Sequence, residues 1–85
     1  MISLESACKI AISDFTALGS NKIRSIQDAG DMWLFSAAFN ETNYAGGMVY
    51  VEKINGKTKP FSCTKIEDLK ILNTSPQIKV PIKYL

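Results

Sequence analysis

The clearest pattern of apolar and polar positions lies at the start of the chain and predicts an amphipathic helix over residues 3–18. Its apolar residues recur at intervals of three and four, which places their side chains on one face of an α-helix. They are Leu4, Ala7, Cys8, Ala11, Ile12, Phe15 and Leu18. Ser3 suits the N-cap position, and Gly19 suits the left-handed residue that closes a helix. The helix therefore has an apolar face that must pack against another element.

Four segments between residues 22 and 63 have the composition of β-strands and are separated by turn-forming residues. The expected strands are residues 22–27, 32–39, 48–54 and 57–63. In the first, Ile23 and Ile26 fall on opposite parities, which requires a bulge or the burial of only one of them. In the second, both parities carry apolar residues. This is typical of a central strand that the helix covers on one face and that is partly covered on the other.

Two local signals describe the second half of the predicted sheet. Asn55-Gly56 is a strong hairpin signal, and it indicates a type I′ turn with positive φ at both positions. Pro60 cannot donate a hydrogen bond to a neighbouring strand, so we expect it at an edge or a bulge.

The end of the chain predicts a short helix over residues 65–72 and an extended tail over residues 77–84. Thr64 and Glu67 match a capping box at the start of this helix. The helix should bury three apolar residues, namely Ile66, Leu69 and Leu72. The tail alternates, and one of its sides carries Ile78, Val80, Ile82 and Tyr84.

Strands that follow one another without crossover helices form an antiparallel sheet. We therefore expect an α+β fold: the N-terminal helix packs on an antiparallel sheet of four strands, or five, in a cystatin-like layer, with a short second helix. A chain of 85 residues has room for one core, so residues 1–85 are expected to form one domain. Trp33, Phe35 and Phe39 from the sheet and Phe15 from the helix should anchor that core.

The composition disfavours an enzyme. The chain contains no histidine, which removes the Ser-His and Cys-His nucleophile pairs and histidine-ligated metals. Asp28 and Asp31 flank Gly30, where carboxylates commonly serve turn formation, and Cys8 and Cys63 are expected to be buried, reduced thiols. We expect no catalytic residue, cofactor or metal, and keep a small enzyme using Asp28, Asp31 or Cys63 as an alternative.

The charge is unevenly distributed along the chain. Residues 1–50 carry three basic and five acidic residues, whereas residues 51–85 carry seven lysines and three acidic residues. Three of these lysines, at positions 53, 57 and 59, surround one hairpin, and we interpret them as protection of an edge strand rather than as a nucleic-acid surface. No secretory signal and no apolar run of membrane-spanning length is visible, so we expect a cytoplasmic protein without nucleic acid or membrane as a partner.

The order of elements resembles the YrhB-like domain of immunity proteins in bacterial polymorphic toxin systems. The resemblance covers roughly residues 3–72 and rests on the capped helix, the Trp33-Leu34-Phe35 strand and the strand that runs from Met48 into the Gly56 hairpin. The chain has Glu52 where the family tends to have Asp, and Asn55 where it tends to have Thr. The pattern also resembles PepSY modules, which accompany proteases and the cell envelope, although the missing export signal argues against them.

The resemblance implies a cytosolic immunity protein that binds one cognate toxin and blocks it by steric and electrostatic complementarity. The candidate contact residues are acidic or polar, which suits a toxin that binds anionic substrates, and plain solvation of loops is an equal alternative. They are Asp28, Asp31, Glu41, Asn43 and Tyr44. The alternative function is a small non-catalytic interaction or self-association module, for example a homodimer, that pairs through its edge strand or its C-terminal tail.

Overall fold

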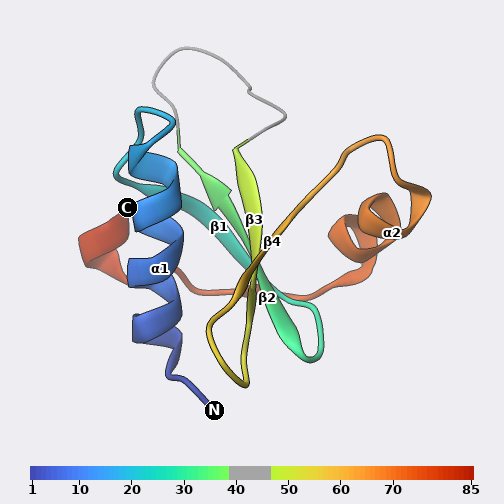
Figure 1. Cartoon of the computed structure of the whole chain (residues 1–85), viewed down its shortest axis with the longest axis horizontal. Helices are drawn as coiled ribbons and strands as arrows, with labels where there is room; N and C mark the ends of the chain where they lie inside the picture. The colour runs from blue at the N-terminus through green and yellow to red at the C-terminus, as the bar shows by residue number, and fades with distance from the viewer. Residues whose placement is uncertain (39–46) are drawn as a thin grey trace.

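An antiparallel sheet with the strand order β4-β3-β2-β1-β5 forms the middle layer of the part of the chain that the structure describes, residues 1–38 and 47–85. In the computed structural model, α1 lies on one side of this sheet and α2 on the other (Figure 1). The elements are α1 (Leu4–Thr16), β1 (Ile23–Asp28), β2 (Met32–Ala37), β3 (Met48–Glu52), β4 (Thr58–Pro60), α2 (Ile66–Thr74), β5 (Gln77–Ile78) and a 3-10 helix (Ile82–Tyr84). The expected α+β class is confirmed, and the described sheet has five strands because the tail contributes β5.

Helix α1 begins where the sequence predicts and ends earlier. The Ser6 amide donates to the Ser3 hydroxyl oxygen at 3.1 Å, which confirms the N-cap. At the other end Gly19 has φ 91°, and the amides of Gly19 and Ser20 donate to the carbonyls of Thr16 and Phe15. This pair of bonds is a Schellman closure, and it leaves Leu18 outside the helix with 54% of its surface exposed.

Strand β2 is the central strand and is covered on both faces, as predicted. Trp33, Phe35 and Ala37 pack with α1, whereas Leu34 lies on the opposite face with Tyr50 and Phe61. The strand ends at Ala37, so the expected extension stops short, and Phe39 lies outside the described residues.

A bulge in β1 resolves the parity conflict between Ile23 and Ile26. The register of β1 against β2 shifts between Ile23 and Ser25. The extra residue rotates the strand, so both isoleucines are fully buried in the core under α1.

Helix α2 presents a different face to the sheet from the one predicted. Ile66 is 82% exposed and Leu69 is 36% exposed, so their expected burial is wrong. Ile71 and Leu72 pack instead against Leu34, Tyr50 and Phe61. The reason is polar: the Asp68 carboxylate accepts hydrogen bonds from the Tyr50 hydroxyl at 2.9 Å and from the Ser62 amide at 3.0 Å. These two bonds turn the Asp68 side of the helix toward the sheet.

The start of α2 and the second cysteine also differ from expectation. Lys65 is the N-cap and makes no side-chain capping bond, whereas the Thr64 hydroxyl pairs with that of Ser62 at 2.8 Å, so the capping box is not formed. Cys63 precedes α2 and is exposed, so its expected burial is wrong, whereas Cys8 lies on the buried face of α1; both thiols are free. Of the helices in the described ranges, none has both the length and the apolar character needed to cross a membrane.

The β3–β4 connection is longer than a two-residue type I′ hairpin. Strand β3 ends at Glu52 and β4 begins at Thr58, so both are shorter than expected. Gly56 has φ 74°, but Asn55 does not have positive φ. The Gly56 amide donates to the Glu52 carbonyl at 2.8 Å, and the Lys57 amide donates to the Asn55 side chain at 2.9 Å. Pro60 lies in the edge strand β4, as predicted.

The tail is partly extended and closes the molecule beside α1 (Figure 1). Gln77 and Ile78 pair with Gln27 and Ile26 of β1, and Val80 is buried in the core under α1. The alternation then breaks, because the chain turns into a 3-10 helix after Pro81 and leaves Ile82 80% exposed.

Gly56 and Gly30 allow a matched test of the hairpin packing. Both have positive φ, so substitution by alanine should cost about 1–2 kcal/mol of backbone strain at each. A Cβ at Gly56 would lie 2.9 Å from Ile10 Cδ1, whereas at Gly30 it would meet nothing within 4 Å. We expect Gly56→Ala to lower the free energy of unfolding by about 1 kcal/mol more than Gly30→Ala, because overpacking costs about 1–3 kcal/mol and the isoleucine methyl can move. Urea titration measures this difference; equal losses would contradict it.

Candidate functional site

The turn between β1 and β2 is held together by the Asp28 carboxylate. Its Oδ1 atom accepts a hydrogen bond from the Gly30 amide at 3.0 Å and lies 2.8 Å from Lys53 Nζ. The hydrogen bond from Lys53 lowers the pKa of Asp28 most, and the bond from the Gly30 amide lowers it further. Asp28 is therefore engaged within the molecule, and Asp31 is the carboxylate of this turn that remains exposed.

Lys53 joins three separate segments at this end of the sheet. Its amide donates to the Asp31 carbonyl at 3.0 Å, and its own carbonyl accepts the Ile2 amide at 2.8 Å. Its ammonium group lies 5.3 Å from the centroid of the Trp33 ring, within the range of a cation–π contact. The N-terminal segment and the two turns are thereby fixed relative to one another by main-chain bonds.

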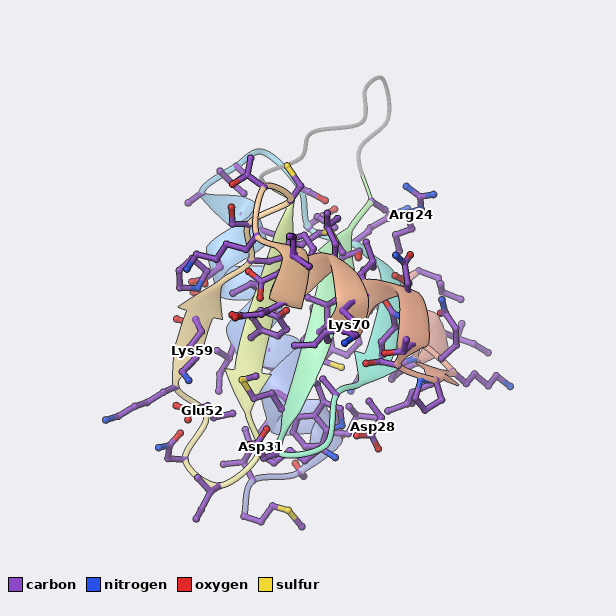
Figure 2. The ribbon with its side chains drawn as sticks, turned by 90° about the vertical axis from the view of Figure 1, so that its right-hand side faces the viewer. Arg24, Asp28, Asp31, Glu52, Lys59 and Lys70 are labelled. Atoms are coloured by element: carbon purple, nitrogen blue, oxygen red, sulfur yellow. The ribbon has the colours of Figure 1, made fainter. Side chains whose placement is uncertain are left out.

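These contacts build an exposed area that we call the turn-end surface, defined by Met1, Asp31, Glu52 and Ile54. Ile54 is 75% exposed and Met1 is 92% exposed. Figure 2 shows Asp28, Asp31 and Glu52 at the same end of the sheet, away from Arg24. The carboxylates of Asp28, Asp31 and Glu52 thus lie at one end of the sheet, where the Asp28 carboxylate pairs with Lys53.

Of the five predicted contact residues, the structure describes Asp28 and Asp31. Asp28 and Asp31 lie together at the start of β2, although Asp28 is used for the turn. The described residues that flank the next loop, Ala38 and Gly47, lie at the other end of β2. Glu41, Asn43 and Tyr44 lie outside the described residues.

Sequence reasoning missed Ile54 and the role of Lys53. The sequence predicts both within the strand over residues 48–54, which ends at Glu52 in the structure. The signal that marks Ile54 is its position directly before Asn55-Gly56, which places it on the turn. Nothing in the sequence signals the Lys53 junction, because its partners come from the N-terminal segment and from another turn.

Three other titratable groups with a shifted pKa, those of Cys8, Tyr50 and Asp68, make contacts within the fold. Burial raises the pKa of the Cys8 thiol. Burial and the hydrogen bond to Asp68 raise the pKa of Tyr50, whereas the Ser62 amide and the Tyr50 hydroxyl lower the pKa of Asp68. Within residues 1–38 and 47–85, no three Cys, Asp or Glu side chains gather as metal ligands would.

No protein-family model, no curated protein and no solved structure matches the chain. The comparisons therefore support no family assignment.

The turn should show the acid sensitivity of a carboxylate whose pKa is lowered by folding. Such a group stabilises the folded state above its unfolded pKa, and the contribution is lost as the pH falls through the folded value. We expect Asp28→Asn to lower the Tm at pH 7, and the difference from the wild type to shrink as the pH falls below 3.8. Asp31→Asn is the control and should leave the Tm unchanged, because Asp31 contributes its carbonyl. A pH-independent difference for Asp28→Asn would contradict the assignment.

The contact between Tyr50 and Asp68 can be tested by titration. In Tyr50→Phe the carboxylate loses one donor and keeps the Ser62 amide, so the pKa of Asp68 should rise toward its ordinary value. Carbon-detected NMR of the carboxyl group measures this change. Tyr84→Phe, which alters a tyrosine on the α1 side, is the control and should leave the Asp68 titration unchanged. An unchanged pKa in Tyr50→Phe would contradict the contact.

Proposed function

We propose that the protein is a cytosolic immunity protein that binds one bacterial toxin and neutralises it by covering it, without chemistry of its own. The observation that carries this proposal is the turn-end surface: the exposed Ile54 directly follows Lys53, whose amide bonds to the Asp31 carbonyl, and Glu52 lies at the same end of the sheet as Asp31. The YrhB-like resemblance suggests the class of function, and the turn-end surface suggests how contact is made.

The turn-end surface has an ordered main chain before it binds a partner. An exposed apolar side chain can act as an anchor in a partner's pocket, while surrounding charges set the rate and specificity of association. Because Lys53 already fixes both turns, little further ordering is needed on binding. A toxin that acts on an anionic substrate has a basic active site, and acidic side chains around Ile54 complement it.

The contacts of the candidate nucleophiles and bases support a non-catalytic role. Asp28 is paired with Lys53, and burial raises the pKa of Cys8, which disfavours a reactive thiolate. The small-enzyme alternative retains Asp31, in the β1–β2 turn, and the exposed Cys63, which lies between β4 and α2.

Self-association is the second candidate, because β4 is an edge strand whose three residues are exposed, although Lys57 and Lys59 oppose the pairing of two copies through it. The tail is a poorer route to a homodimer, because Gln77 and Ile78 already pair with β1 and Val80 is buried. Pairing the tail with another copy would first break these contacts.

Co-expression tests the immunity proposal. The protein encoded by the adjacent gene should arrest growth alone, and this chain should restore growth and form a complex with it. Asp31→Lys should slow association at low salt by about tenfold, since charges beside an anchor mainly steer the encounter, and Ile54→Ser should speed dissociation. Glu67→Lys, an exposed charge reversal on α2, is the matched control and should behave as the wild type. Absence of both rescue and complex would refute the proposal.

A further inference from the structure

A groove runs between α1 and the open edge of the sheet. Helix α1 packs on β2 and β3, which leaves the β4 side of the same sheet face less covered. The groove has α1 on one wall and the β3–β4 hairpin on the other. It is lined by Ile10, Ser13, Asp14, Gly56, Lys57 and Thr58. An adjoining hollow shares Ser13 and Asp14 and continues toward Leu18 and Met48.

Within the part of the chain that the structure describes, the main chain of β4 has hydrogen-bonding groups beside this groove that pair with no other strand. The Glu52 amide donates to the Lys57 carbonyl, and the register places Lys59 opposite Tyr50. Because bonded pairs alternate along an antiparallel ladder, Lys59 is bonded to β3, and Thr58 and Pro60 point their main-chain groups outward. The outer edge of β4 therefore presents the N–H and C=O of Thr58 and the C=O of Pro60.

The side chains of β4 define which face of an added strand would meet the groove. Thr58 and Pro60 lie opposite Val51 and Val49, which belong to the core under α1. Lys59 lies opposite Tyr50, which belongs to the α2 side (Figure 2). A strand added to β4 would thus direct every second side chain into the groove beside Ile10 and Ser13, and the others to the face of Lys59.

We propose that the β4 edge and the α1 groove form a binding site for an extended segment of a partner protein, which adds to the sheet as a sixth strand next to β4. Main-chain bonds to Thr58 would supply the pairing, and the groove would select small apolar side chains on one face of the segment. The site goes beyond the proposed immunity function and does not rest on it, since the turn-end surface uses other side chains.

Charge decides against a second copy of this chain as the occupant. If two β4 strands paired antiparallel about Thr58, Lys57 of each copy would face Lys59 of the other, and like charges directly opposite each other destabilise a sheet. Pro60 also removes one outward amide, so the edge gives few bonds to an unselected strand. The segment that fits carries acidic residues opposite Lys57 and Lys59 and apolar residues toward the groove.

The experiment uses the full chain and a peptide that alternates glutamate and valine and has both termini blocked. The peptide has about eight residues, which is within the usual length of a β-strand. At about 1 mM peptide, amide NMR signals of residues 57–62 and of the facing side of α1 should shift. Thr58→Pro removes the outward amide without touching the bonds to β3, and should weaken binding at least about tenfold with little change in Tm. Thr58→Val keeps that amide and is the matched control, with affinity within about threefold of the wild type.

Methylation of peptide nitrogens separates strand pairing from charge attraction. Two versions of the peptide are compared, one methylated on the valine nitrogens and the other on the glutamate nitrogens. Only one of them should lose binding, because only every second amide of an added strand faces β4. Three results would overturn the proposal: equal binding of both methylated peptides, unchanged binding to Thr58→Pro, or no shift at residues 57–62. Concentration-dependent dimerisation that Thr58→Pro removes would overturn the choice of occupant and assign the edge to a second copy.

Discussion

The fold depends on the burial of both faces of strand β2. Trp33 and Phe35 point to one side and Leu34 to the other, and each fully buried side chain of this size contributes about 1.5–3 kcal/mol. Neither face can remain in water, so the chain must supply a cover on each side of the sheet. Helix α1 covers one with Ala11 and Phe15, and α2 covers the other.

The two covers are held by different physical means. Helix α1 buries a continuous apolar stripe, whereas α2 has no fully buried residue and relies on polar attachments. Gln27, only 3% exposed, donates from Nε2 to the carbonyls of Leu72 and Ser75 at 2.7 and 3.0 Å. A buried amide without such partners would be costly, so these bonds fix where α2 ends as firmly as packing fixes α1. The Asp68 contacts set its rotation.

The β3–β4 hairpin links the architecture to both proposed binding surfaces. Its Lys53 ties the turn to the N-terminal segment and to the β1–β2 turn, and Gly56 lets Ile2 and Ile10 approach the main chain closely. The exposed Ile54 and the open edge at Thr58 are carried on this same hairpin. A partner that contacts either would meet a surface whose main chain is already ordered.

Local periodicity and turn chemistry, read from the sequence alone, determined the start of α1, the antiparallel order, the central place of β2 and the edge position of Pro60. These features depend on neighbours close in the chain, so a short window of sequence contains their cause. Only the tertiary structure decided which face of α2 is buried, that Cys63 and Ile82 are exposed, and that Asp28 is paired while Ile54 stands free. Three of those outcomes depend on a partner distant in sequence: Tyr50 for the buried face of α2, β1 for the tail and Lys53 for Asp28. Hydrogen bonds and packing between distant segments leave no periodic trace along the chain, and for that reason the turn-end surface emerged only once the three segments were seen together.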